Sequence, residues 1–106
     1  MYYIYILRCQ DNSLYIGITT DIKRRFHEHI SKANKGAKNT KAHAVESIEF
    51  CMVCQNRSIA SKMEYRLKTL SKKQKENLIQ NHDNLKIYFQ DQLDLSLYEI
   101  IQVNIE

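Results

Sequence analysis

Two short segments near the N-terminus constrain the fold of this chain more than any other feature. They are Tyr3-Ile4-Tyr5 and Tyr15-Ile16-Gly17, and in each of them aromatic and β-branched residues alternate. This alternation is typical of β-strands, and the polar residues Gln10-Asp11-Asn12 between them are typical of a hairpin turn. We therefore predict one strand over residues 2–8 and a second, antiparallel strand over residues 13–19.

The loop length decides whether Tyr5 and Tyr15 share a face of this hairpin. The two tyrosines lie ten positions apart and so have the same parity. A two-residue loop would place the phenols on opposite faces, whereas a three- or five-residue loop, or a bulge, would place both on one face. Gly17 lies inside the second strand, where a missing side chain lets a phosphate or a neighbouring backbone approach; a bulge or close crossing explains it equally well.

The following residues predict a mixed α+β fold. Apolar residues recur at helical spacing after Thr20-Asp21 and again after Asn56, and Ser71-Lys72-Lys73-Gln74 is a capping box that begins a third helix. Residues 45–54 alternate as a third strand. We expect a small three-stranded, mainly antiparallel sheet flanked by helices, an α/β-sandwich-like arrangement in the order β-β-α-β-α-α.

Two polar or acidic segments are harder to assign. Residues 31–43 contain four lysines among glycine, asparagine and threonine residues and are predicted to form a loop, which either contacts nucleic acid or is simply solvated. After position 81 the composition changes, with strand-like alternation at Leu85, Ile87 and Phe89. We divide the chain into a domain over 1–80 and an acidic extension over 81–106 that packs on the same domain, on a protein partner or on a second copy in a homodimer.

Charge is distributed unevenly along the chain. Residues 1–80 contain fifteen Lys and Arg against seven acids, a balance of +8, and residues 81–106 contain one Lys against five acids, a balance of −4. A basic body favours a polyanion such as DNA, although many basic proteins bind none. No apolar run is long enough to span a membrane, and the three cysteines suit reduced thiols, so we expect a cytoplasmic protein.

Three polar side chains border the predicted helical cores. Arg25 and His29 lie one turn apart beside the apolar stripe of the first helix, and Glu64 lies beside that of the second. Glu64 and Lys68 could form an ordinary surface pair at i,i+4. The pair Cys51 and Cys54 has metal-ligand spacing, but residues three apart on a strand point to opposite faces, so we expect buried thiols.

Taken in order, these residues are similar to the GIY-YIG nuclease family. The family pattern is a strand ending in a tyrosine, then Tyr-x-Gly about ten residues later, an arginine on the next helix and a glutamate on a later helix. Tyr5, Tyr15 with Gly17, Arg25 and Glu64 fit it, although Tyr3 stands where the first motif has its glycine. The resemblance covers residues 2–80.

The resemblance implies a site and a reaction. Tyr5 would activate water with Tyr15 beside it, His29 would relay the proton, and Arg25 would contact phosphate. Glu64 would hold Mg²⁺ or Mn²⁺, since one carboxylate with several waters is a usual magnesium site. Substrate contacts are implied for Gly17, Asn77 and, from a Gly-Ala-Lys-x-Thr run, Lys38 and Thr40.

We therefore expect a metal-dependent endonuclease that hydrolyses DNA with structure-guided or weak specificity, in DNA repair or recombination. One alternative is a catalytically silent nucleic-acid-binding module of the same fold. The other is an interaction protein in which the matched polar residues are ordinary surface residues without a catalytic role.

Overall fold

The chain begins with the predicted antiparallel hairpin, formed by β1 (Tyr2–Cys9) and β2 (Leu14–Thr19). A three-residue loop connects the strands: the Cys9 amide donates to the Ser13 carbonyl at 2.9 Å, and the Asn12 amide donates to the Cys9 carbonyl at 2.9 Å. Asn12 has a φ of 69°, the left-handed conformation that closes a hairpin loop of this length. The hairpin is thus the one that places residues of equal parity on one face.

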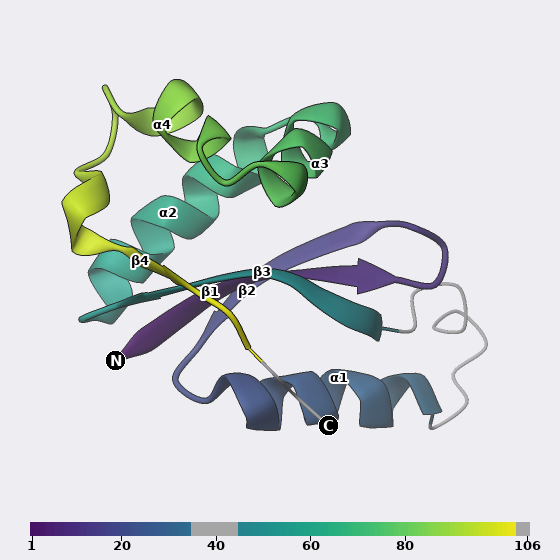
Figure 1. Cartoon of the computed structure of the whole chain (residues 1–106). Coiled ribbons are helices and arrows are strands. Elements are labelled where there is room, and N and C mark those ends of the chain that lie inside the picture. The colour runs from purple at the N-terminus through teal and green to yellow at the C-terminus, as the bar shows by residue number, and fades with distance from the viewer. Residues whose placement is uncertain (35–44, 104–106) are drawn as a thin grey trace.

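The computed structural model describes residues 1–34 and 45–103, which form one antiparallel sheet with helices on both faces (Figure 1). The strand order is β2-β1-β3-β4. The remaining elements are α1 (Ile22–Asn34), β3 (Val45–Cys54), α2 (Arg57–Thr69), α3 (Lys72–Gln80), α4 (Asn84–Phe89), a short 3₁₀ helix (Leu95–Leu97) and β4 (Glu99–Ile101).

The α+β class and the antiparallel sheet agree with the prediction, but the sheet has four strands where three were expected. The fourth strand is β4, which pairs with β3 at Cys51, Met52 and Val53. Three residues are too short for a recognisable alternation, so no strand is predicted for this segment from the sequence.

Two further local predictions are wrong. Residues 84–89, predicted to be strand-like, form helix α4, because Leu85 and Phe89 are four residues apart and both are buried, while Ile87 between them is 71% exposed. The predicted loop over 31–43 begins too early, since α1 continues to Asn34. The rest of that segment lies outside the described residues.

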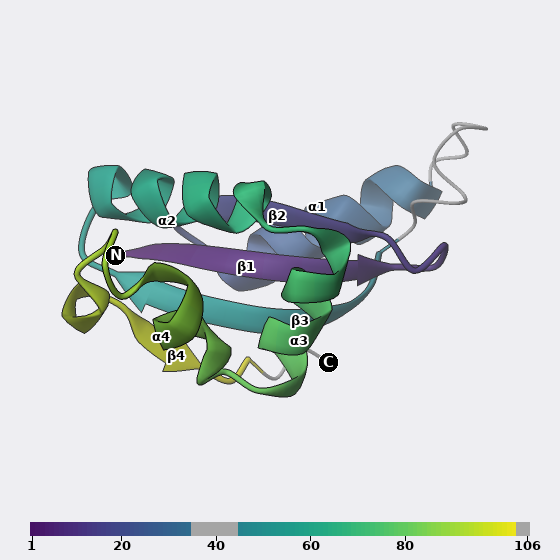
Figure 2. The same ribbon diagram turned by 90° about the horizontal axis from the view of Figure 1, so that it is seen from above.

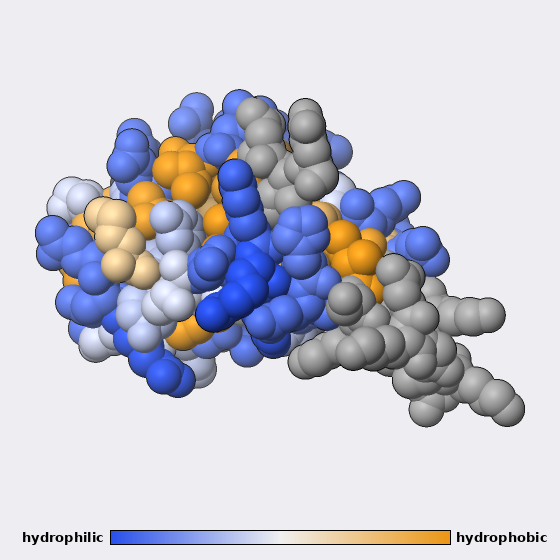
Figure 3. Space-filling view, turned by 90° about the horizontal axis from the view of Figure 1, so that it is seen from below, coloured by the Kyte–Doolittle hydropathy of each residue, from blue (hydrophilic) through white to orange (hydrophobic). Residues whose placement is uncertain are grey.

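Apolar side chains on the two faces of the sheet form two cores. Helices α2, α3 and α4 cover one face, where Ile4, Ile6 and Met52 are fully buried, and α1 covers the other, where Tyr5 and Leu7 are buried (Figures 1 and 2). The outer surface on the α1 side is largely hydrophilic (Figure 3). Strand β2, at the edge of the sheet, is in contact with α2. Functional groups from both faces can therefore meet at this edge.

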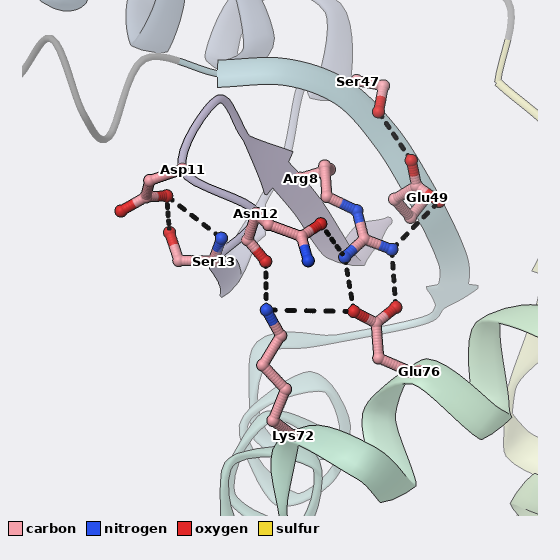
Figure 4. A network of polar contacts seen from close by, with 8 residues as sticks. All are labelled: Arg8, Asp11, Asn12, Ser13, Ser47, Glu49, Lys72 and Glu76. Atoms are coloured by element: carbon pink, nitrogen blue, oxygen red, sulfur yellow. Dashed lines mark hydrogen bonds and ion pairs between the residues drawn. The ribbon is translucent and has the colours of Figure 1, made fainter.

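A polar network fastens the hairpin loop to α3 (Figure 4). The Arg8 guanidinium donates two hydrogen bonds to the Glu76 carboxylate, at 2.5 and 2.6 Å, and a third to the Asn12 side chain at 3.0 Å. Lys72 donates to the Asn12 carbonyl and lies 3.9 Å from Glu76. The network joins the end of β1 to α3, sixty-eight residues later in the chain. It therefore fixes the hairpin loop against the layer formed by α2, α3 and α4.

None of the helices in the described ranges is both long and apolar enough to cross a membrane.

The Arg8–Glu76 pair predicts a pH-dependent contribution to stability. Arg8 lowers the pKa of Glu76 from its ordinary value of 4.5, so the pair stabilises the fold fully above that value and loses its effect as pH falls toward the lower, folded-state pKa. We expect Glu76→Gln to lower the free energy of unfolding by about 1–3 kcal/mol at pH 7, because the hydrogen bonds involve charged groups.

Urea unfolding of wild type and variant at pH 7 and at pH 3 measures this difference. The difference in the free energy of unfolding between the two proteins should be smaller at the lower pH. The exposed Glu99, changed to Gln, is the matched control and should behave as wild type at both. A Glu76→Gln deficit of equal size at pH 7 and pH 3 would contradict the ionic origin of the effect.

Candidate functional site

Tyr5 and Tyr15 lie on the same face of the hairpin, as the loop of three residues requires. Tyr5 pairs across the strands with Gly17, and Tyr15 pairs with Leu7, so the two tyrosines are diagonal neighbours. Their ring centroids are 6.4 Å apart. Tyr5 is only 1% exposed, whereas Tyr15 is 44% exposed. One phenol is thus held inside the protein and the other borders solvent.

Gly17 provides the space that the Tyr5 side chain occupies. A Cβ atom at position 17 would lie 2.4 Å from the Tyr5 hydroxyl oxygen and 2.7 Å from its Cζ. Both distances are well inside van der Waals contact, so Tyr5 can cross its neighbour strand only where no side chain stands. Gly17 therefore positions the phenol, and a direct contact between Gly17 and substrate stays a prediction.

Helix α1 supplies Arg25 and His29 to the same face. The Asp21 carboxylate accepts a hydrogen bond from the Arg24 amide at 3.1 Å and begins the helix. Burial of Ile22 against the sheet then fixes the rotation of α1. His29 Nε2 lies 3.3 Å from the Tyr5 hydroxyl oxygen, and its ring centroid lies 5.1 Å from that of Tyr15.

Arg25 interacts with both tyrosines and with an acid that the sequence analysis did not select. Its guanidinium is 3.0 Å from the Glu28 carboxylate, which also lies 3.6 Å from Arg24. Tyr5 first, and Glu28 second, raise the pKa of Arg25 above its usual value. The i,i+3 spacing of Arg25 and Glu28 is the sequence signal for this pair. Glu28 thus holds a permanently charged guanidinium beside the phenols.

Glu64 approaches from the opposite layer, on α2. Its side chain is 24% exposed and lies 3.5 Å from Lys68, so the expected i,i+4 pair is present. The carboxylate is nevertheless close enough to Tyr5 to contribute to raising the pKa of that phenol. Because α2 contacts edge strand β2, Glu64 approaches the same edge of the sheet as the groups from the α1 face. The ion pair with Lys68 does not prevent this approach.

The net effect of this environment is to keep the proton on Tyr5. Burial raises the pKa of the phenol, the adjacent Arg25 lowers it, and Tyr15 and Glu64 raise it further, so that the pKa lies above the ordinary value of 10.0. A nearby arginine is expected to lower the pKa of a tyrosine. Arg25 does act in that direction on Tyr5, but desolvation is the larger effect.

Glu64 is the carboxylate in this site that fits a divalent cation. In the described part of the chain, no three His, Cys, Asp or Glu side chains come together as a metal cluster. A partly exposed carboxylate is suited to Mg²⁺ bound mainly by water. Cys51 and Cys54 are buried on opposite faces of the sheet, as predicted, and burial raises the pKa of Cys51 to about 12.

One predicted substrate contact, Asn77, lies on α3, and two others fall outside the described residues. Asn77 is an exposed residue of α3, and its carbonyl accepts hydrogen bonds from Asn81 and Asn84 at 2.9 Å each. Lys38 and Thr40 fall outside the described residues. The roles of all three in substrate binding stay predictions.

Comparisons with known proteins agree on one family. The model of the GIY-YIG catalytic domain matches residues 1–77. The UPF0213 protein FN1575 of Fusobacterium nucleatum is 47% identical over 83 residues, which are 78% of this chain and 81% of that protein. The UPF0213 protein YhbQ of Salmonella typhimurium is 42% identical over 78 residues, covering 74% and 76% of the two chains.

One similar solved structure is the solution NMR structure of the UPF0213 protein BH0048 from Bacillus halodurans. It is 32% identical, with a TM-score of 0.49, and the match covers 89% of this chain and 100% of that one.

The close crossing of Tyr5 over Gly17 predicts a strong coupling between the two positions. We expect Gly17→Ala to lower the free energy of unfolding by about 1–3 kcal/mol, because the new methyl group collides with the phenol. In a Tyr5→Ala background the collision is absent, and the cost of Gly17→Ala should fall to a few tenths of a kcal/mol. Chemical denaturation of the four proteins of this cycle measures the coupling. An equal cost of Gly17→Ala in both backgrounds would mean that the glycine serves another purpose.

Proposed function

The chain belongs to the GIY-YIG family of catalytic domains, and we propose that it is a Mg²⁺-dependent endonuclease that hydrolyses DNA phosphodiester bonds. The observation that carries this proposal is the meeting of five polar groups at one sheet edge. Tyr5, Tyr15, Arg25 and His29 come from one face, and Glu64 comes from the other. Neither core requires a buried phenol next to a guanidinium, an imidazole and a carboxylate for packing.

Arg25 is suited to the phosphate. Charge develops on the non-bridging oxygens during phosphodiester hydrolysis, and a planar guanidinium can donate to two such oxygens. The side chain is 29% exposed, so it can reach an incoming backbone, while Glu28 occupies part of its hydrogen-bonding capacity. A phosphate that docks here displaces or shares the Glu28 contact. Arg25 is thus paired with Glu28 in the free protein and with phosphate in the complex. Its charge has a partner in both states.

Tyr5 and His29 form the proton path. Since Tyr5 retains its own proton, a standing phenolate is not required: the phenol accepts a proton from the attacking water as its own proton passes to His29 Nε2. The oxygen of that water bonds to phosphorus, and the leaving oxygen departs with the bonding electron pair and takes up a proton from solvent. This relay needs the Nε2 atom of His29 to be free of a proton at the start, which the neutral imidazole tautomer with its proton on Nδ1 provides. Tyr15, more exposed, lies beside both groups and can orient the water.

The carboxylate of Glu64 is the residue that would hold Mg²⁺, or Mn²⁺ in its place. The ion would supply positive charge at the phosphoryl and leaving oxygens. The Lys68 ammonium, 3.5 Å from the same carboxylate, neutralises Glu64 in the free protein.

A small domain of this kind has few means of reading a long sequence. We therefore propose structure-guided or loosely specific cleavage, in DNA repair or recombination in the cytoplasm. The basic balance of residues 1–80 supports a nucleic-acid substrate. The C-terminal residues expose Ile87, Leu97 and Ile100, which supports a contact with a protein partner or a second copy.

Cleavage of branched, flapped and plain duplex DNA with Mg²⁺ or Mn²⁺ tests the proposal. We expect Glu64→Gln to reduce the cleavage rate at least about a hundredfold, because a metal ligand is lost, and Tyr5→Phe to have a similar effect. Glu99→Gln and Tyr88→Phe remove the same groups at positions away from the site and should cleave as wild type. Chelation by EDTA should stop the reaction.

Binding without cleavage by the wild type would favour the silent nucleic-acid-binding module instead. Equal cleavage by wild type, Glu64→Gln and Tyr5→Phe would point to a contaminating nuclease and would overturn the proposal.

A further inference from the structure

A hollow lies on the outward side of α2, around the helix from Glu64. Its volume is about 550 Å³, and it extends from the helix to the turn that follows α4. The side chains that matter for its chemistry are an aromatic ring, two cations, two hydroxyls and an amide, contributed by Tyr65, Lys62, Arg66, Ser58, Ser61 and Gln92. We call it the α2 groove.

Tyr65 is the most unusual of these residues, because its ring is left uncovered. It is 65% exposed, although burial of an aromatic ring is one of the larger apolar gains available to a small domain. The Arg66 guanidinium carbon lies 5.7 Å from the ring centroid. An exposed aromatic ring beside a cation is the arrangement on which unpaired nucleobases stack, because every base offers a π-face.

The cations of the groove are available to a ligand. Within the described residues, neither Lys62 nor Arg66 takes part in an ion pair, whereas Lys68 on the same helix is paired with Glu64. Two unpaired cations next to an aromatic ring suit the phosphates on either side of one nucleotide. The hydroxyls of Ser58 and Ser61 can donate to and accept from a base edge or sugar.

Acidic residues limit the groove on its far side. Gln92 is flanked by Asp91 and Asp94, and the Asp94 carboxylate is already bonded to the Ser96 amide and hydroxyl at 3.1 and 2.5 Å. Phosphates are therefore attracted to the α2 side and repelled from the α4 side. This polarity favours a short stretch of one strand over a duplex, which would place a second backbone against the acids.

Helix geometry places the α2 groove relative to Glu64. Tyr65 follows Glu64 directly, so the two side chains leave α2 about 100° apart. Lys62 and Arg66 each lie two positions from Glu64, so their side chains leave α2 about 160° from it, on the far side of the helix. From these observations we propose that the α2 groove binds an unpaired nucleotide of the substrate that lies across α2 from the scissile phosphate, with its base stacked on Tyr65 and its phosphates at Lys62 and Arg66. The preferred substrate is then DNA that carries a single-stranded tail, flap or branch. This inference rests on the proposed nuclease function.

Binding in EDTA tests the groove without any turnover. The probe is a fluorescent duplex with a short single-stranded tail, made either of thymidines or of abasic spacers with the same phosphates. Anisotropy titrations should give about tenfold tighter binding of the thymidine tail by the wild type, because stacking is lost on the abasic tail. Tyr65→Ala should bind both tails with equal, weaker affinity, and Tyr65→Phe should retain the preference.

Substitution of a cation of the groove should change binding in a different way from substitution of Tyr65. Lys62→Ala should weaken binding of both tails and reduce the slope of log affinity against log salt by about 0.7, the value for one phosphate contact with a single strand. Lys86→Ala removes an exposed lysine of α4 outside the groove and should leave the affinity and the slope unchanged. Far-ultraviolet circular dichroism and unfolding curves establish that each variant is folded.

The two proposals can fail separately. A preference for the thymidine tail that survives Tyr65→Ala would overturn the groove, even if the wild type cleaves DNA in a Glu64-dependent manner. Loss of the preference in Tyr65→Phe as well as Tyr65→Ala would also overturn it, since the ring is retained in the former. A Tyr65-dependent preference in a protein that does not cleave would support the groove and contradict the nuclease.

Discussion

The passage of the Tyr5 ring over Gly17 is the contact on which the rest of the site depends. A buried phenol on a central strand normally points into a core and can reach nothing at the sheet edge. Here the neighbouring edge strand lacks a side chain at the opposed position, so the phenol extends across it toward Arg25, His29 and Glu64. The loop of three residues is a condition for this arrangement, because a one-residue change of register would turn Tyr15 to the other face.

The site is a meeting of two layers. Helix α1 contributes the groups that can bind phosphate and accept a proton, and α2 contributes the carboxylate. An edge strand between them allows both layers to reach one substrate, which a central strand would prevent. The polar network of Arg8, Asn12 and Glu76 supports this geometry from the other end of the hairpin, because it ties the loop to α3. The candidate site and the stabilising polar network thus both depend on the β1–β2 hairpin.

The parts of this molecule that could be predicted are those with local signals. The alternation around Tyr5 and Tyr15, the capping box at Ser71 and the apolar stripe of α2 depend on neighbours in the chain, and they indicate the strands and helices correctly. The order of the tyrosines, Arg25 and Glu64 was sufficient to indicate the family. The burial of Cys51 and Cys54 on opposite faces followed from the period of a strand.

The remainder depends on long-range contacts that leave no local pattern. Strand β4 exists because β3 offers it a free edge, and α4 is helical because Leu85 and Phe89 both meet the core. The Arg8–Glu76 pair joins residues with no periodic relation. The rise in the pKa of Tyr5 reflects how deeply the phenol is buried, which the presence of a nearby arginine could not reveal.

The central claim is that groups from both faces of the sheet form one metal-dependent site at the β2 edge. Paramagnetic broadening by Mn²⁺ in amide NMR spectra tests it most directly, because the ion broadens the nearest resonances whether or not DNA is cleaved. The account predicts broadening centred on residues 15–17 and on Glu64 together, and its loss in Glu64→Gln. Broadening that is centred on the acidic residues 83–99, or that persists unchanged in Glu64→Gln, would contradict it.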